Sequence, residues 1–295
     1  MLTYRHKKAA QSTVKLTDCS TDEQFIQLWL GGKTGNTIAA YRQDIAQFKT
    51  FVENRPLTHL TIDDVAGFAS ALEQQGYAPS SIHRRLYAVK SLLSFGQACG
   101  YLMDNVGGLI ELAPEPKKLS ERILTEEEVL LLIYSEPNPR YKLMLRFLYE
   151  TGCRLSEMCN LKWKDLKKRT PGGQVDILGK VSKVRHILIS EELWFDLVST
   201  RKKAPSTMPV FPTKSGRHYA ASNVVRIVRA AAIRAGLEQK VSPHWLRHAH
   251  ASHSLDRGAP LHLVQATLGH SSISTTERYL HARPDDSSSR YLPKT

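Results

Sequence analysis

The sequence SPHWLRH at residues 242–248 is followed by LGH at residues 268–270 and by STTERY at residues 274–279. His244 and Arg247 are three residues apart, so they share one face of a predicted helix. Gly269 is typical of a helix end, which predicts that His270 lies in the loop that follows. The STTE sequence has the form of a capping box, and its helix would present Tyr279 one turn in. Together these side chains can hold a phosphate, move a proton and supply an oxygen nucleophile.

The same stretch is rich in histidine, which raises a zinc site as an alternative. His244 and His248 have the i, i+4 spacing of a metal-binding helix, and His250 and His253 follow. The glutamate of the HExxH pattern is absent, however, and a guanidinium inside a metal shell would repel the metal cation. We therefore predict no metal site. The ordinary expectation for the later histidines, from His248 onward, is core hydrogen bonding.

Upstream of this stretch, helical patterns lead to a second polar motif. TEEE at residues 125–128 forms a capping box before an apolar run. A helix with apolar residues at 143–148 leads to TGCRLSE at residues 151–157, where Gly152 suggests a chain break and Glu157 lies at the start of the next helix. Further helices are predicted from Glu191 and from a cap at residues 222–223 to Ala235.

Strand signals lie between these helices. QVDIL at residues 174–178 and VRHILI at residues 184–189 flank the turn GKVSK, and this pattern predicts a β-hairpin. The turn carries Lys180 and Lys183. Residues 123–295 are therefore predicted to form a mixed α+β domain.

The first half of the chain has only helical signals. Ile38, Tyr41, Ile45 and Phe48 recur at three- and four-residue intervals, and similar patterns give four short helices in residues 21–107. This predicts an all-α first domain. Residues 1–20 are expected to be a basic arm, and residues 108–122 are expected to be a linker. The fold class is thus mainly α with a small β-hairpin.

Basic side chains gather on the fourth predicted helix, in the linker and in the hairpin turn. Charges on a helix are usually solvated, so contact with water alone and contact with phosphate both stay open for them. The candidates for contact with phosphate groups of a polyanion are His83, Arg84, Arg85, Lys90, Lys117, Lys118 and Lys183.

Charge and composition narrow the class of partner. The 295 residues carry a net charge of +13, which favours a polyanion, because counterions are released when it binds. No segment approaches the ~18 continuous apolar residues of a membrane span, and no basic amphipathic helix favours a membrane surface. The four cysteines are scattered and form no CxxC pair, which indicates reduced thiols in a cytoplasmic protein.

In combination, the motifs resemble those of the tyrosine recombinase family, which includes phage integrases and Xer-like recombinases. The resemblance rests on TGCRLSE, HxxR, LGH and a tyrosine nine residues after His270, in this order along the second domain. The helical first domain resembles the family's core-binding, SAM-like domain. The resemblance implies a site-specific DNA recombinase with the tyrosine recombinase fold.

The resemblance also implies roles for residues of this chain. Arg154 and Arg247 match the two arginines that neutralise the phosphate, a task suited to bidentate guanidinium contacts. Tyr279 matches the nucleophile that forms a 3′-phosphotyrosyl link and frees a 5′-hydroxyl. His244 matches the position that assists proton transfer at the tyrosine, and His270 matches the position that hydrogen-bonds the phosphate.

Two further assignments come with alternatives. Lys180 matches the hairpin lysine that protonates the 5′-oxygen, because it follows Gly179 as in the family's Gly-Lys turn, but Lys183 lies in the same turn. Glu157 matches a carboxylate that orients the site, and it is also placed to serve the positive end of its own helix. No metal, ATP or other cofactor is implied, since the tyrosyl link keeps the energy of the phosphoester.

The resemblance implies a homotetramer on two double-stranded DNA sites, with accessory proteins as further candidate partners. In this family the tail, here residues 281–295, docks on a neighbouring protomer, and Tyr291 and Leu292 are the apolar anchors it offers. The competing interpretations are a DNA-binding protein that has lost catalysis and a zinc hydrolase built on the histidines. Integrase, excisionase, resolvase and invertase roles stay open, because site choice depends on which side chains enter the grooves.

Overall fold

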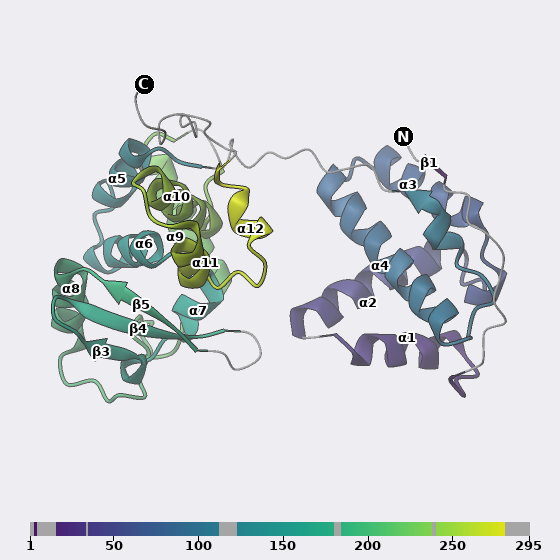
Figure 1. The fold of residues 1–295 in the computed structure, drawn as a ribbon, viewed down its shortest axis with the longest axis horizontal. Helices are drawn as coiled ribbons and strands as arrows, with labels where there is room; N and C mark the ends of the chain where they lie inside the picture. The colour runs from purple at the N-terminus through teal and green to yellow at the C-terminus, as the bar shows by residue number, and fades with distance from the viewer. Residues whose placement is uncertain are drawn as a thin grey trace, which may run out of the picture. The chain divides into compact units, whose positions relative to one another are not determined.

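The computed structural model describes residues 3–4, 16–33, 35–111, 123–179, 184–237 and 240–280. The chain divides into two compact units, Met1–Pro116 and Lys117–Thr295. Figure 1 shows the described elements of each unit. Within the described ranges, no helix is both long and apolar enough to cross a membrane. Several residues named above lie outside the described residues: Lys117, Lys118, Lys180, Lys183 and the tail at 281–295.

The first unit contains the four helices that the sequence predicts. Thr21 accepts a hydrogen bond from the backbone of Gln24 and caps the first, while Thr61 and Asp64 form a capping box at the third. Pro79 lies in the first turn of the fourth helix, where its missing N–H has no helical partner to lose. The helices are α1 (Asp22–Gly31), α2 (Gly35–Phe51), α3 (Ile62–Gln74) and α4 (Pro79–Ala98).

The core of the first unit is aromatic and aliphatic. Phe25, Phe48 and Phe68 are buried among the four helices. The chain continues through a 3-10 helix, η2 (Val106–Leu109), into strand β2 (Ile110–Glu111), which pairs with β1 (Thr3–Tyr4). Ile110 is only 1% exposed in this core, so the first unit continues past residue 107 into the segment expected to be linker.

The second unit combines helices with a small antiparallel sheet, as the sequence predicts. The predicted hairpin is present, with Val175 opposite Ile187, and a preceding strand that the sequence did not reveal pairs with its first strand. The sheet order is β3 (Leu166–Lys168), β4 (Gly173–Leu178) and β5 (Val184–Ile189).

The helices of the second unit enclose one main core. Helix α6 lies against the sheet and packs against α10 (Figure 1). Leu246 and Ala249 of α10 are buried in this core. The helices are α5 (Glu126–Tyr134), α6 (Pro139–Thr151), α7 (Leu155–Asn160), α8 (Glu191–Arg201), α9 (Ala221–Arg234), α10 (Pro243–Asp256), α11 (Leu261–Leu268) and α12 (Ser274–Glu277).

Two predicted helix caps are wrong. Ser274 does not cap α12, because the N-cap position is Ile273 and no side chain bonds there. Instead, the hydroxyl of Thr276 bonds to His270, and the short helix ends before Tyr279. Likewise, α9 begins at Ala221, so the expected cap at residues 222–223 lies inside its first turn.

Candidate active site

Helix α11 ends in two consecutive carbonyl groups that hold the two arginines. The carbonyl oxygen of Leu268 accepts a hydrogen bond from Nη2 of Arg247 at 2.8 Å, and that of Gly269 accepts one from Nη2 of Arg154 at 3.1 Å. Gly269 has φ of 66° and ends the helix, as the sequence predicts. Because a helix C-terminus is partially negative, it favours cations at this point.

Arg247 is the buried member of this pair, with 3% of its surface exposed. Its Nη1 donates to the carbonyl oxygen of Gly152 at 2.6 Å. Gly152 has φ of 56°, and a Cβ there would lie 2.6 Å from Cδ2 of His250, so the turn requires glycine. Burial and the neighbouring charge of Arg154 lower the pKa of Arg247 to about 10, which leaves the guanidinium charged at neutral pH.

Glu157 fixes the other arginine. Its carboxylate accepts bonds from the backbone N–H of Arg154 at 2.6 Å and from Nη1 of the same residue at 3.1 Å. Arg185 on β5 donates to both carboxylate oxygens, at 2.9 and 2.7 Å, and its Nε donates to the carbonyl of Thr267 at 2.8 Å. Burial acts to raise the pKa of Glu157, but the hydrogen bonds from Arg185 and Arg154 outweigh it and lower that pKa. Glu157 therefore lies at the N-terminus of its helix and also joins two arginines.

Tyr279 lies just beyond α12 and is 5% exposed. Its ring packs among Ala251, Val264 and Leu268. The phenol oxygen is 2.7 Å from Nδ1 of His248. Burial raises the pKa of the Tyr279 phenol, and the positive charges of Arg247 and Arg278 partly oppose that shift.

His244 and His270 flank this pair. The ring of His244 is exposed and lies 4.3 Å from the ring of His248, centroid to centroid. The ring of His270 is parallel to that of Tyr279 at 6.5 Å, and its Nδ1 is 2.9 Å from Oγ1 of Thr276. Burial and the charges of both arginines lower the pKa of His270 to about 4, so this ring is neutral at pH 7.

The last two histidines of α10 have the core role expected from the sequence. Nδ1 of His250 donates to the carbonyl oxygen of Tyr149 at 2.8 Å. His253 bonds through Nε2 to the carbonyl of Leu124 and through Nδ1 to the hydroxyl of Tyr149, each at 2.9 Å. Among the residues that the structure describes, no group of three or more His, Cys, Asp or Glu could hold a metal.

Three of the four basic candidates on α4 have partners within the first unit. Arg84 forms an ion pair with Asp44, and Lys90 donates to the carbonyl of Ile110. Arg85 donates to Oε1 of Gln47 at 2.8 Å. Lys90 therefore ties α4 to β2, whereas Arg84 remains exposed at the surface and His83 is half-buried.

Two residues of the site escaped the sequence interpretation. His248 was expected in the core, yet it contacts the phenol of Tyr279. Its position one helical turn after His244 was the available signal. Arg185 shares a face of β5 with the buried Ile187 and Ile189, and a charge on an inward strand face requires a partner.

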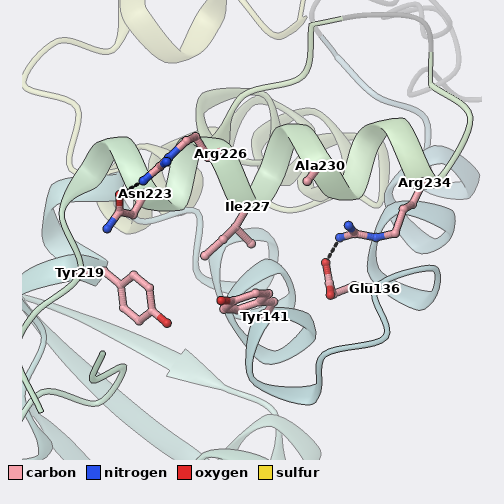
Figure 2. A pocket seen from close by; sticks show the side chains of 8 residues that line it. All are labelled: Glu136, Tyr141, Tyr219, Asn223, Arg226, Ile227, Ala230 and Arg234. Atoms are coloured by element: carbon pink, nitrogen blue, oxygen red, sulfur yellow. Dashed lines mark hydrogen bonds and ion pairs between the residues drawn. The ribbon is translucent and has the colours of Figure 1, made fainter. Parts of the chain in front are cut away.

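A separate cavity of about 390 Å³ lies along α9, and none of the candidate active-site residues described above lines it (Figure 2). Its cations are bonded within it, since Arg234 pairs with Glu136 and Arg226 donates to Asn223. The lining residues are Glu136, Tyr141, Tyr219, Asn223, Arg226, Ile227, Ala230 and Arg234. This cavity is therefore separate from the arginines, histidines and tyrosine that lie around the end of α11.

Comparison with known families decides the class of this chain. The model of the phage integrase family matches residues 122–285, more than half of the chain. The chain belongs to the phage integrase family. The model of the phage integrase N-terminal SAM-like domain matches residues 23–98, which include all of α3. The resemblance expected from the motifs is confirmed.

Individual members of the family align over most of the chain. The tyrosine recombinase XerD of Staphylococcus saprophyticus is 31% identical over 274 residues, covering 88% of this chain and 91% of XerD. The tyrosine recombinase XerC of Roseiflexus castenholzii is 35% identical over 272 residues, covering 86% of this chain and 85% of XerC.

Solved structures of the family share the fold. XerH bound to palindromic difH substrate has a TM-score of 0.72 at 22% identity, covering 83% of this chain and 76% of XerH. A lambda integrase dimer bound to a COC′ core site has a TM-score of 0.72 at 18% identity, covering 90% of this chain and 79% of the integrase. The predicted tyrosine recombinase fold is confirmed.

Proposed function

We propose that this protein is a site-specific DNA recombinase that cleaves and rejoins strands through a 3′-phosphotyrosyl intermediate on Tyr279. The observation that carries this proposal is the pair of arginines held by consecutive carbonyls at the end of α11, with the tyrosine packed on the same helix. Each guanidinium has five N–H groups, and the hydrogen bonds described above use only some of them. The remaining N–H groups of both arginines can bind a phosphate.

The chemistry follows from the charges. Attack on a phosphodiester builds negative charge on the non-bridging oxygens, and Arg154 and Arg247 neutralise it from fixed positions. The phenol oxygen of Tyr279 attacks phosphorus, and the 5′-oxygen leaves with a proton from Lys180, for which Lys183 is the alternative. His270, neutral at pH 7, hydrogen-bonds the phosphate. Because a phenolate is a good leaving group, the step is reversible without ATP or metal.

The proposed substrate is double-stranded DNA. The net charge of +13 supports it, and so do relatives of known structure: XerH is bound to difH substrate, and a lambda integrase tetramer is bound to a Holliday junction. We extend this to a homotetramer on two sites, acting in the cytoplasm. The candidates for phosphate contact are Arg84 and His83 on α4 and, further along the chain, Lys117 and Lys118.

A covalent-trapping assay tests the proposal. Purified protein is incubated with nicked, fragmented genomic DNA in excess EDTA, denatured and resolved on a gel, beside Tyr279→Phe. The proposal predicts a DNA-linked band in the wild type that is absent from the variant. A band that survives in Tyr279→Phe would move the nucleophile elsewhere. A wild type that binds DNA without any band would identify a binding protein that lacks catalysis.

A further inference from the structure

We propose that His248 is the catalytic base that takes the proton of Tyr279, the role that the family resemblance gives to His244. This inference rests on the proposed function, because it concerns the first step of strand cleavage. It adds to the site a residue at the second histidine of the sequence HWLRH.

The contact brings the phenol of Tyr279 within hydrogen-bond distance of the His248 ring. The phenol oxygen and Nδ1 of His248 are 2.7 Å apart, a distance typical of a strong bond. In the tautomer of His248 that carries its proton on Nε2, Nδ1 accepts the phenol proton of Tyr279 through its lone pair. We assign this tautomer to the state that precedes attack, in which His248 is the acceptor of the proton that must leave.

Burial makes a protein acceptor necessary. Tyr279 is 5% exposed and packed among Ala251, Val264 and Leu268, so bulk water has little access to its hydroxyl. Burial opposes formation of the phenolate, whereas Arg247 and Arg278 favour it. A base in direct contact removes the need for a free phenolate before attack.

The step balances in both directions. In cleavage, the phenol oxygen of Tyr279 forms the bond to phosphorus, its proton passes to Nδ1 of His248, and the bond from phosphorus to the 5′-oxygen breaks. The departing oxygen takes its proton from the hairpin lysine of the proposed function. In rejoining, the 5′-hydroxyl attacks, the phenol oxygen leaves, and the imidazolium of His248 returns the proton.

His244 has a different place in this arrangement. Its ring is exposed and lies against the ring of His248, at 4.3 Å, so it stands on the solvent side of the base. From there His244 can contact the phosphate or exchange a proton between His248 and solvent. Its loss should therefore harm cleavage less than loss of the base itself.

The test measures single-turnover cleavage of a nicked duplex that carries a site recovered by trapping. His248→Asn keeps an oxygen acceptor near the position of Nδ1 but cannot take a proton. Loss of a general base slows a reaction by roughly 10²–10⁴-fold, and we expect a loss in that range. His244→Asn should lose less, and His262→Asn, an exposed histidine of α11, should cleave like the wild type.

Two further measurements separate a base from a residue that only positions the tyrosine. Replacing Tyr279 by a fluorotyrosine lowers the pKa of the phenol, which should restore part of the rate to His248→Asn. A substrate with sulfur in place of the bridging 5′-oxygen needs no proton on its leaving group, so it should rescue Lys180→Ala and leave His248→Asn slow.

The outcomes are distinct. A His248→Asn variant that cleaves at the wild-type rate, or whose defect is unchanged by fluorotyrosine, would overturn the assignment while the wild-type adduct still supports the recombinase. A wild type that forms no adduct on the duplex would overturn the proposed function and this inference with it.

Discussion

Arg185 donates hydrogen bonds to both carboxylate oxygens of Glu157, and this pair joins strand β5 to helix α7. Glu157 in turn holds the backbone and side chain of Arg154. Arg185 is the second residue of β5, so the contact links this strand to one of the two arginines. It is a structural tie between parts of the site that lie far apart in the sequence.

Replacing Arg185 by methionine should destabilise the second unit strongly. Side chains of Arg185 and Glu157 are 13% and 9% exposed, and removing one member of a buried ion pair costs roughly 3–5 kcal/mol. Urea denaturation measures the loss. The double variant Arg185→Met/Glu157→Gln should recover part of this loss. In the double variant the Glu157 carboxylate is also absent, so no buried charge remains without its partner.

A matched control is the exposed pair of Arg257 and Glu126, whose side chains are 72% and 41% exposed. Exposed pairs contribute about 0–1 kcal/mol, so Arg257→Met should change little. Equal losses for Arg185→Met and Arg257→Met would contradict the structural role given to the Arg185 contact.

Gly152→Ala should both destabilise the fold and disturb Arg247. The new Cβ would lie 2.6 Å from His250, at a φ of 56° that costs about 1–2 kcal/mol for a residue with a side chain. Gly236→Ala is the control, since Gly236 has φ of 68° but open space around it. Thermal unfolding should rank Gly152→Ala well below Gly236→Ala, and similar shifts for the two would argue against the close packing.

Acid should weaken the second unit through His250. Burial lowers the pKa of this histidine from 6.5 to about 4. Below pH 6.5, His250 therefore binds a proton in the unfolded chain. In the folded protein the same side chain stays neutral down to about pH 4. The contribution of neutral His250 to the free energy of unfolding is fully present above pH 6.5. It declines as pH falls below that value, by up to ~1.4 kcal/mol per pH unit.

Denaturation of His250→Asn as a function of pH checks this. Asparagine keeps an N–H donor for the carbonyl of Tyr149 but does not titrate, so the slope between pH 6.5 and 4 should decrease. His262→Asn, at an exposed site, should retain the wild-type slope. An unchanged slope in His250→Asn would assign the acid sensitivity to other groups.

The two hairpin lysines can be separated kinetically. If Lys180 protonates the 5′-oxygen, Lys180→Ala should lose roughly 10²–10⁴-fold in cleavage of ordinary DNA, and Lys183→Ala should lose far less. The sulfur-bridged substrate described above should restore Lys180→Ala. Rescue of Lys183→Ala in its place would exchange the two roles.

The sequence predicted the helices well because their signals are local. Thr125 forms the expected capping box, and Gly269 ends α11 as expected. Strand β3 was missed because its short run of leucine and two lysines has no alternation of its own and forms only against β4. The box at residues 274–277 failed because Thr276 bonds to His270, a tertiary contact.

The motifs indicated candidate residues for the site, but they did not indicate the contacts between those residues. Arg154 and Arg247 meet at the end of α11, and no spacing in the sequence reveals which carbonyl each arginine contacts. The same holds for His248 and Arg185, whose partners lie 31 and 28 residues away. Such pairings follow from packing, which local patterns do not encode.

The most direct measurement is the identity of both ends of the cleaved strand. The trapped adduct is digested with trypsin and nuclease and analysed by mass spectrometry, and the released DNA end is labelled by a kinase without prior phosphatase. The account predicts a nucleotide linked through its 3′-phosphate to Tyr279, and a 5′-hydroxyl that labels directly. A phosphate on the 5′ end, or a nucleotide on any other residue, would contradict it.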